Sequence, residues 1–498
     1  MKVFRLANLV LAVLLLSWTA NGYAAESPHS LSITILHVND LHGHIQTTAK
    51  SGGAAYLAGL VEQHRSADPG GTVLLAAGDM FQGTPISNVF RGKPVVEIMN
   101  RLKFDAVTLG NHEFDWGWPE LLKIMEQASS PYLAANLVNR DMSRPPKIKK
   151  SILLERKGVK IAVIGIITPE TAFTTNPRNV EDFKFLQPES VLPKMVRVAR
   201  AKGAKLIIVL SHCGLERDVK IARRVQGIDV IIGGHSHTAV TPPLVAGKTI
   251  IAQAGSNGLY LGVLKLEIDG KSGRVIDYSR DNLKSITASP GSPFDPEIEK
   301  IVSRYSDSIK NEFSRIVGES GVDLLRNSEG ESNLGNLICD AMRSESGAEI
   351  AFYNSGGIRA NIYHGKVRLE QAFEALPFDN VLVSMDLTGE QVKSILEKSA
   401  SMEIGILQVS GLKYKINASK PKDGRVEDVT VNGSKLQPAK VYRIVTNDFL
   451  AAGGDRFLTF KEGKNIVYGD DVRESFIRYL EKRSPVAPRV EGRIVIAR

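Results

Sequence analysis

Cysteine is scarce in this chain, whose 498 residues include two, Cys213 and Cys339. They lie far apart in sequence, each in a segment that is typical of the core of a different domain. An exported chain can form a disulfide, but this placement favours two buried free thiols. The chain also lacks internal repeats and low-complexity tracts, and its length favours two or three ordinary globular domains.

Long apolar runs and basic clusters are missing as well. After residue 24 no segment is long and apolar enough to span a bilayer. No cluster of lysine and arginine with interleaved aromatic residues indicates a track for a nucleic-acid polymer. The formal net charge is +9, and it falls to +7 without Lys2 and Arg5. This modest excess favours anionic ligands in general.

The first 24 residues have the parts of a secretory signal peptide. A short basic head at 1–5 precedes an unbroken apolar run at 9–16, and the small residues Gly22 and Ala24 stand at positions −3 and −1 of a cleavage site. No cysteine follows that could take a lipid anchor. We expect cleavage near Ala24 and a mature chain that is secreted, or periplasmic in a cell with two membranes.

The rest of the chain alternates short apolar runs, typical of buried strands, with helical stretches. This pattern predicts an α/β layered domain over 30–290. Successive strands at 248–278 predict an antiparallel flank at its end. The expected strands are 31–38, 72–77, 106–109, 132–135, 160–166, 205–210 and 228–232, and the expected helices are 54–65, 94–102, 189–201 and 215–225.

A Pro-Gly-Ser-Pro break at 290–293 begins a linker, placed at 291–320, that contains an amphipathic helix at 296–313. A second α/β domain is expected over 321–498. Its predicted helices are 334–343 and 388–399, and its predicted strands are 349–353, 381–385, 442–446 and 494–496.

Polar side chains follow five of the predicted strands. The segment 110–115 reads Gly-Asn-His-Glu-Phe-Asp, and gathering such groups after an apolar strand is costly unless a metal or a phosphate compensates. Ligands bind at the carboxyl ends of strands in α/β sheets. The other four ends are Asn-Asp-Leu-His at 39–42, Gly-Asp at 78–79, Ser-His at 211–212 and Gly-Gly-His-Ser-His at 233–237.

A single Asp or His after a strand is more often a capping or turn residue, but five such ends together predict a metal site. Oxygen and imidazole donors without thiolate suit Zn, Mn or similar divalent ions, and a shared carboxylate can bridge two of them. Two metals about 3.5–4 Å apart can clamp the attacking and leaving oxygens of a phosphoryl transfer.

The motifs at these strand ends resemble those of the calcineurin-like metallophosphoesterase superfamily. The second domain resembles the C-terminal domain of secreted bacterial 5'-nucleotidases in three motifs, at 354–359 (Asn-Ser-Gly-Gly-Ile-Arg), 376–380 (Leu-Pro-Phe-Asp-Asn) and 447–455. The resemblance implies an N-terminal four-layer α/β/β/α sandwich followed by a smaller α/β domain.

The resemblance also implies two divalent metal ions that lower the pKa of bound water for attack on phosphorus. His112 would stabilise the phosphoryl group or protonate the leaving oxygen, and Asp115 would orient it; the alternative for His112 is a structural turn histidine. Glu113 receives no assigned chemistry. By resemblance, one metal takes Asp40, His42, Asp79 and His237, and the other takes Asp79, Asn111, His212 and His235.

In the second domain, the resemblance implies a nucleotide-binding surface. Arg359 would bind phosphate or carboxylate, Phe378 and Phe449 would stack on the base, and Asp455 would accept hydrogen bonds from ribose. The alternative for each phenylalanine is an ordinary core position. Asn354 and Asn380 could assist.

Two arginines depart from the family pattern. Arg326 stands about two residues too far from the Gly-Asn-Leu at 335–337 to align with the family's arginine. Arg456 replaces the third glycine of the family's Gly-Gly-Asp-Gly-Phe motif and puts a long cation beside Asp455.

These observations predict an exported dimetal phosphohydrolase that releases phosphate from nucleoside 5'-monophosphates, with activity that could extend to nucleoside di- and triphosphates or UDP-sugars. The alternative enzyme is a 2',3'-cyclic-nucleotide 2'-phosphodiesterase with 3'-nucleotidase activity. The alternative of another class is a secreted nucleotide-binding protein without catalysis. The native metal, the preferred nucleotide and the oligomeric state stay open.

Overall fold

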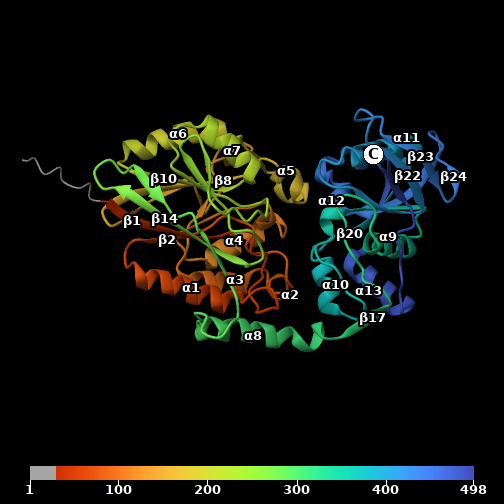
Figure 1. Ribbon diagram of the computed structural model, residues 1–498. Helices are drawn as coiled ribbons and strands as arrows, with labels where there is room; N and C mark the ends of the chain where they lie inside the picture. Colours follow the sequence, from red (N-terminus) through yellow and green to blue (C-terminus); the bar gives the residue numbers. More distant parts are fainter. Residues whose placement is uncertain (1–29, 498) are drawn as a thin grey trace, which may run out of the picture.

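A larger N-terminal part and a smaller C-terminal part make up the fold, which we describe from a computed structural model of residues 30–497 (Figure 1). The expected signal peptide lies outside these residues. Helix α8 (Pro296–Phe313) begins and ends at the bounds expected for the linker helix, and it packs on α1 (Gly53–Ala67) and α3 (Lys93–Leu102) of the N-terminal part. Within the described residues, no helix combines the length and apolar character needed to cross a membrane.

Two sheets pack face to face in the N-terminal part. Apolar side chains of both sheets, among them Ile35, Leu75, Val163 and Ile208, form one buried cluster between them. The first sheet has the order β15-β14-β1-β2-β3-β4-β6 with β16 beside β14, and the second has the order β12-β13-β11-β10-β8-β7. Their strands are β1 (Ser30–Val38), β2 (Thr72–Ala76), β3 (Ala106–Thr108), β4 (Tyr132–Leu133), β6 (Ile148–Lys149), β7 (Ser151–Arg156), β8 (Val159–Ile167), β10 (Leu206–His212), β11 (Val230–Ile232), β12 (Leu244–Ala246), β13 (Thr249–Ala252), β14 (Tyr260–Asp269), β15 (Val275–Tyr278) and β16 (Leu283–Ser285).

Helices cover both outer faces of this sandwich (Figure 1). The first sheet packs against α1, α3 and α4 (Trp118–Gln127), and the second packs against α6 (Pro188–Ala201) and α7 (Leu215–Arg224). The four-layer α/β/β/α arrangement is therefore confirmed.

The end of this part differs in one respect from the expected antiparallel flank. Strands β14, β15 and β16 do pair antiparallel, with β14 lying along β1. However, β13 pairs parallel with β11, because the chain finishes the second sheet before it crosses to the first. Hydrophobicity patterns cannot show which sheet a strand joins.

The C-terminal part is a second α/β unit, as expected. Its five-stranded sheet has the order β21-β18-β25-β20-β26 and its four-stranded sheet the order β24-β23-β22-β27. The strands are β18 (Ile350–Asn354), β20 (Val381–Thr388), β21 (Leu407–Ser410), β22 (Leu412–Asn417), β23 (Val426–Val431), β24 (Ser434–Lys435), β25 (Val441–Asn447), β26 (Lys464–Asp471) and β27 (Ile494–Ala497), and the main helices are α9 (Asn333–Ser346), α10 (Leu369–Ala375), α11 (Gly389–Ala400) and α13 (Val472–Arg483).

Both cysteines are buried and free, as predicted. Cys213 packs in the core beneath α6 and α7, and Cys339 packs in the core around α9.

Strands β1 and β14 approach closely at one position, where a residue larger than glycine cannot fit without a change in packing. His37 pairs with Gly262 in register and is fully buried, and burial lowers its pKa to about 3, so the ring stays neutral. A Cβ atom at position 262 would lie 2.1 Å from His37 Nε2. Glycine is therefore required beside this ring.

We expect Gly262→Ala to lower the free energy of unfolding by about 1–3 kcal/mol, because the new methyl group forces a packed ring to move. Urea unfolding of the full chain measures this. Gly424→Ala is the matched control, since its nearest atom would be Pro421 O at 3.8 Å. Equal stability of the two variants would contradict the prediction.

Candidate active site

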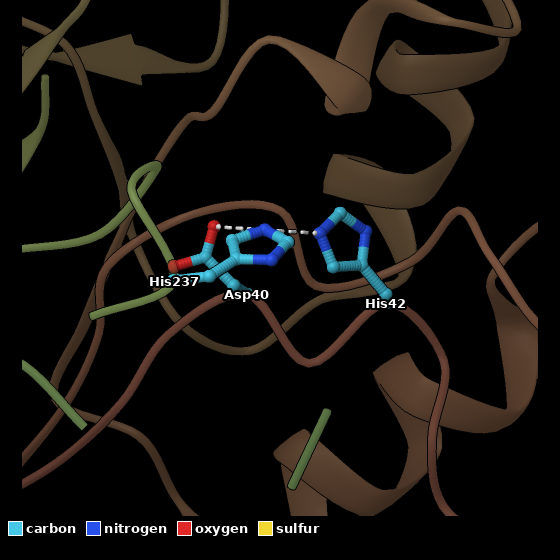
Figure 2. A group of neighbouring side chains, drawn as sticks. All are labelled: Asp40, His42 and His237. Atoms are coloured by element: carbon cyan, nitrogen blue, oxygen red, sulfur yellow. Dashed lines mark hydrogen bonds and ion pairs between the residues drawn. The ribbon is translucent and has the colours of Figure 1, made fainter. Parts of the chain in front are cut away.

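Two groups of potential ligands meet at the carboxyl ends of the parallel strands. Asp40, His42 and His237 form one group, and Asp79, His212 and His235 form the other. Within each group the potential ligand atoms all lie within 4.8 Å of one another. Figure 2 shows the side chains of the first group pointing toward one another. The structure therefore brings together six of the seven residues expected to bind metal, and it separates them as the resemblance implies.

The backbone that presents these ligands is strained. Five of the six ligand residues have left-handed φ angles, from 49° at Asp40 to 76° at His235, a region that residues other than glycine rarely adopt. Backbone hydrogen bonds hold two of the loops together, from Asp40 N to Gly78 O and from His42 N to Asp79 O, each 3.0 Å. Strain of this kind clusters at functional sites when the surroundings enforce it.

The side-chain atoms fit a pair of divalent cations. The Nε2 atoms of His42 and His237 face each other at 3.1 Å. Among the described residues, no group forms a hydrogen bond with the buried Asn111 Oδ1, and the buried His212 Nε2 lies 3.0 Å from Asp79 Oδ2. The donors are carboxylate, amide and imidazole atoms, which suit Zn or Mn. Asn111, the seventh expected ligand, lines the same cavity as Asp79 and His235 of the second group.

Most of these groups are already in the protonation state that binds a metal. Burial lowers the pKa of His42 and lowers the pKa of His235 to about 4, so both rings are neutral. Burial alone would raise the pKa of Asp79, but the nearby His212 and His112 hold it well below its usual range. For His212, burial is outweighed by Asp79, which raises its pKa to about 10. Metal binding must therefore displace a proton from His212.

His112 lies beside the ligands with a fixed orientation. Its Nδ1 is 2.7 Å from Asp115 Oδ2, and Thr175 Oγ1 donates to Asp115 Oδ1 at 2.8 Å. Burial alone would lower the pKa of His112, but the carboxylates of Asp115 and Asp79 outweigh it and raise the pKa. These carboxylates thus favour the protonated imidazole, and because Nδ1 faces Asp115, Nε2 is the nitrogen left to face a substrate.

Glu113 is a supporting residue that the sequence did not reveal. Its carboxylate accepts hydrogen bonds from the backbone N–H groups of Asp79 (2.9 Å), Met80 (2.7 Å) and Gly110 (2.5 Å). It therefore ties the ligand loop after β2 to the loop after β3. Burial is the main reason that its pKa is raised, to about 7. The one sequence signal is a carboxylate directly after Asn-His at a strand end.

The six expected substrate residues line one cavity between the two parts. Its volume is about 560 Å³, and Asp79, Asn111, His112, His235 and His237 line its other wall. The six residues of the C-terminal part are Asn354, Arg359, Phe378, Asn380, Phe449 and Asp455.

Several of these residues contact one another or His112. The Phe378 ring stacks on His112 with centroids 5.6 Å apart, and the Arg359 guanidinium lies 5.9 Å from the Phe378 centroid. Asp455 is buried beside Asn354, and burial is the main reason that its pKa is raised, to about 7. The cavity thus presents a cation, an aromatic face and a carboxylate.

The two unusual arginines lie outside the lining of this cavity. Arg326 donates to the backbone oxygen of Arg359 at 2.8 Å. Arg456 turns toward the N-terminal part, where it forms an ion pair with Glu170 at 3.2 Å and lies 4.0 Å from the Phe173 centroid. The long cation expected beside Asp455 therefore points away from the substrate cavity.

Comparison with known proteins agrees with this geometry. The family described as calcineurin-like phosphoesterase matches residues 33–239, and the family described as 5'-nucleotidase, C-terminal domain, matches residues 310–462. The 5'-nucleotidase of Homo sapiens is 31% identical over 564 residues, covering 98% of this chain and 94% of that protein. A crystal structure of a 5'-nucleotidase precursor from Thermus thermophilus is similar, with a TM-score of 0.86 and 32% identity over 94% of this chain and 99% of that chain.

A longer protein is also similar. The trifunctional nucleotide phosphoesterase protein YfkN of Bacillus subtilis (strain 168) is 32% identical over 518 residues. These cover 93% of this chain and 35% of that protein.

We expect Glu113→Gln to cost about 1–3 kcal/mol of stability, because an amide N–H would then face backbone N–H groups and leave a buried donor unpaired. Looser ligand loops should also weaken metal binding by about 10–100-fold. Thermal unfolding and isothermal titration with Mn²⁺ measure the two effects. The exposed Glu126→Gln is the control, and unchanged Mn²⁺ affinity in Glu113→Gln would contradict the prediction.

Proposed function

Since this chain belongs to the 5'-nucleotidase family of calcineurin-like phosphoesterases, we propose that it releases phosphate from nucleoside 5'-monophosphates. It is a hydrolase of phosphoric monoesters that uses two divalent metal ions. The observation that supports the substrate is the single cavity in which the ligand groups and His112 face Phe378, Phe449 and Asp455.

Seven residues would hold the metals. Asp79 would be shared between the two metal positions, and the bound ions would supply Lewis-acid chemistry that activates water and neutralises charge on the phosphoryl group. Asp40, His42 and His237 complete one site, and Asn111, His212 and His235 complete the other.

His112 protonates the leaving oxygen or stabilises the transferring phosphoryl group. Asp115 occupies Nδ1, so the proton on Nε2 is the one available to the substrate. The raised pKa of His112 favours the protonated form, which carries this proton. The stacked Phe378 ring fixes the plane of the imidazole.

The C-terminal part binds the rest of the nucleotide. Arg359 lies close enough to His112 and Phe378 to bind the phosphate, and a guanidinium does this with paired hydrogen bonds. Phe378 and Phe449 stack on the base, which tolerates different bases. Asp455 accepts from the ribose hydroxyls, with Asn354 and Asn380 alongside.

We also propose that the chain is exported and that it has two domains joined by a linker. Residues 1–24 direct secretion, or transport to the periplasm, and are then removed. The catalytic domain spans 30–290, the linker 291–320 and the substrate-binding domain 321–498. The family matches at 33–239 and 310–462 support this division.

A broader phosphoesterase activity is the second candidate. The 32% identity to a trifunctional nucleotide phosphoesterase favours it. Under this alternative, 2',3'-cyclic nucleotides would also be hydrolysed at the same metals.

Phosphate release from AMP, 2',3'-cyclic AMP and UDP-glucose tests the proposed function. With Mn²⁺ or Zn²⁺ we expect release from AMP, and EDTA should abolish it. His112→Ala should keep its metals and lose about 10²–10⁴-fold in kcat, the usual contribution of a general acid. The exposed His364→Ala is the control. The absence of chelator-sensitive hydrolysis of all three substrates, measured from the nucleotide products as well as from phosphate, would refute an enzymatic role.

Nucleoside binding should depend on pH through Asp455. Its raised pKa of about 7 means that the carboxyl group is mostly neutral at pH 6 and ionised at pH 8. Because the ionised form accepts both ribose hydroxyls, adenosine affinity should be about ten-fold higher at pH 8 than at pH 6. Adenosine carries no phosphate, so phosphate ionisation does not contribute. Asp455→Asn should bind weakly and without this pH dependence; an equal dependence in both proteins would exclude the assignment.

A further inference from the structure

One short segment contacts both the catalytic pair and the C-terminal part. The 168–180 segment connects β8 to β9 (Phe183–Phe185) and contains the four-residue helix α5 (Thr171–Thr174) and the 3₁₀ turn η2 (Pro177–Val180). It has little regular structure of its own, so its conformation depends on the groups that it contacts.

On one side the segment holds the loop that contains His112. Thr175 Oγ1 donates to Asp115 Oδ1 at 2.8 Å. Asn179 Nδ2 donates to the backbone oxygens of Phe114 (3.0 Å) and Asp115 (2.9 Å). Thr175 is buried, so Asp115 receives this hydrogen bond in a site largely closed to solvent. The orientation of His112 therefore depends on the 168–180 segment.

On its other side the segment is held by the C-terminal part. Asn176 Nδ2 donates to Asp448 Oδ2 at 2.7 Å, and Arg178 donates to the Tyr468 hydroxyl. Arg456 forms its ion pair with Glu170, the third contact.

Two of these contacts lie directly beside substrate residues. Asp448 precedes Phe449, and Arg456 follows Asp455. Asp448 is itself fixed, because its Oδ1 accepts from Val381 N of β20 at 3.1 Å. The backbone of Arg456 has a left-handed φ of 61°, so the strained turn that presents Asp455 also presents the arginine. A shift of Phe449 or Asp455 would therefore move Asp448 or Arg456 and change their contacts with the 168–180 segment.

We propose that the 168–180 segment couples its contacts with the C-terminal part to the positioning of His112. Thr175, which contacts Asp115, is the positioning residue of this segment. This inference rests on the proposed function of His112. When the C-terminal part contacts Glu170 and Asn176, as it does in this structure, Thr175 holds the Asp115 carboxylate, which holds the imidazole. Without those contacts the segment relaxes and the imidazole loses its orientation.

The alternative is that the contacts only hold the two parts together. In that case, loss of the C-terminal contacts would raise KM and leave the geometry of the His112 loop unchanged. A double-mutant cycle separates the two, because residues that act through one element have non-additive effects.

A double variant, which we call the released variant, removes two contacts between the segment and the C-terminal part. It carries Asn176→Asp and Arg456→Ala. The new carboxylate at 176 would face Asp448 and repel it, and alanine at 456 keeps a side chain at the left-handed position. The charge-matched control carries Asn311→Asp and Arg197→Ala, two exposed residues on α8 and α6. Thr175→Val removes the hydroxyl, and Thr175→Ser restores it.

With AMP and saturating Mn²⁺ we expect Thr175→Val to lower kcat about ten-fold with KM within about two-fold, because a slightly misplaced catalytic group costs rate rather than binding. Thr175→Ser should recover most of the loss. The released variant should lower kcat about five-fold alone and less than about two-fold in the Thr175→Val background. If the released variant lowered kcat by the same factor with and without Thr175→Val, the proposal would be overturned.

Hydrogen–deuterium exchange supplies a readout that does not need activity. In the full chain with Mn²⁺ and no substrate, the released variant should exchange faster than the control in peptides covering 112–117 as well as 168–180. Faster exchange at 168–180 alone would overturn the coupling. Absence of AMP hydrolysis by the unmodified protein would instead count against the proposed function, and the exchange comparison would still decide the coupling.

Discussion

Repulsion between converging electron-rich atoms is the constraint on which the rest of the structure depends. Imidazole nitrogens and carboxylate oxygens from both sheets lie within a few ångströms of one another, and five of the ligand residues are held in left-handed conformations. Such an arrangement is unfavourable in the absence of cations, because buried polar atoms without partners cost free energy. The apolar contact between the two sheets supplies the rigid support that keeps these strand ends together.

Residues outside the ligand set hold this arrangement in place. Glu113 joins two ligand loops by accepting hydrogen bonds from three backbone N–H groups, and Asp115 orients the His112 ring through its Nδ1 atom. The anionic groups are therefore of two kinds. Asp40 and Asp79 face the metal positions, whereas Glu113 and Asp115 hold the loops and the His112 ring beside them. The geometry of the site depends on both kinds.

Much of the fold and of the ligand set could be predicted from the sequence, because both leave local patterns. Buried strands read as apolar runs, and Asp79 or His235 follows such a run directly. The role of Glu113 could not be predicted, since its partners are backbone N–H groups that have no sequence signature. The direction of Arg456 was also not predictable, because Glu170 and Phe173 lie far away in sequence. The parallel pairing of β13 depends on which sheet the chain completes first.

The two buried cysteines have a practical consequence for labelling the protein. Burial raises the pKa of both thiols, so neither is a ready nucleophile toward maleimide reagents at neutral pH. New cysteines placed on the surfaces of the N-terminal and C-terminal parts can therefore be labelled with fluorophores while Cys213 and Cys339 stay in place. The distance between the parts can then be recorded in single molecules during turnover, with both native cores left unaltered.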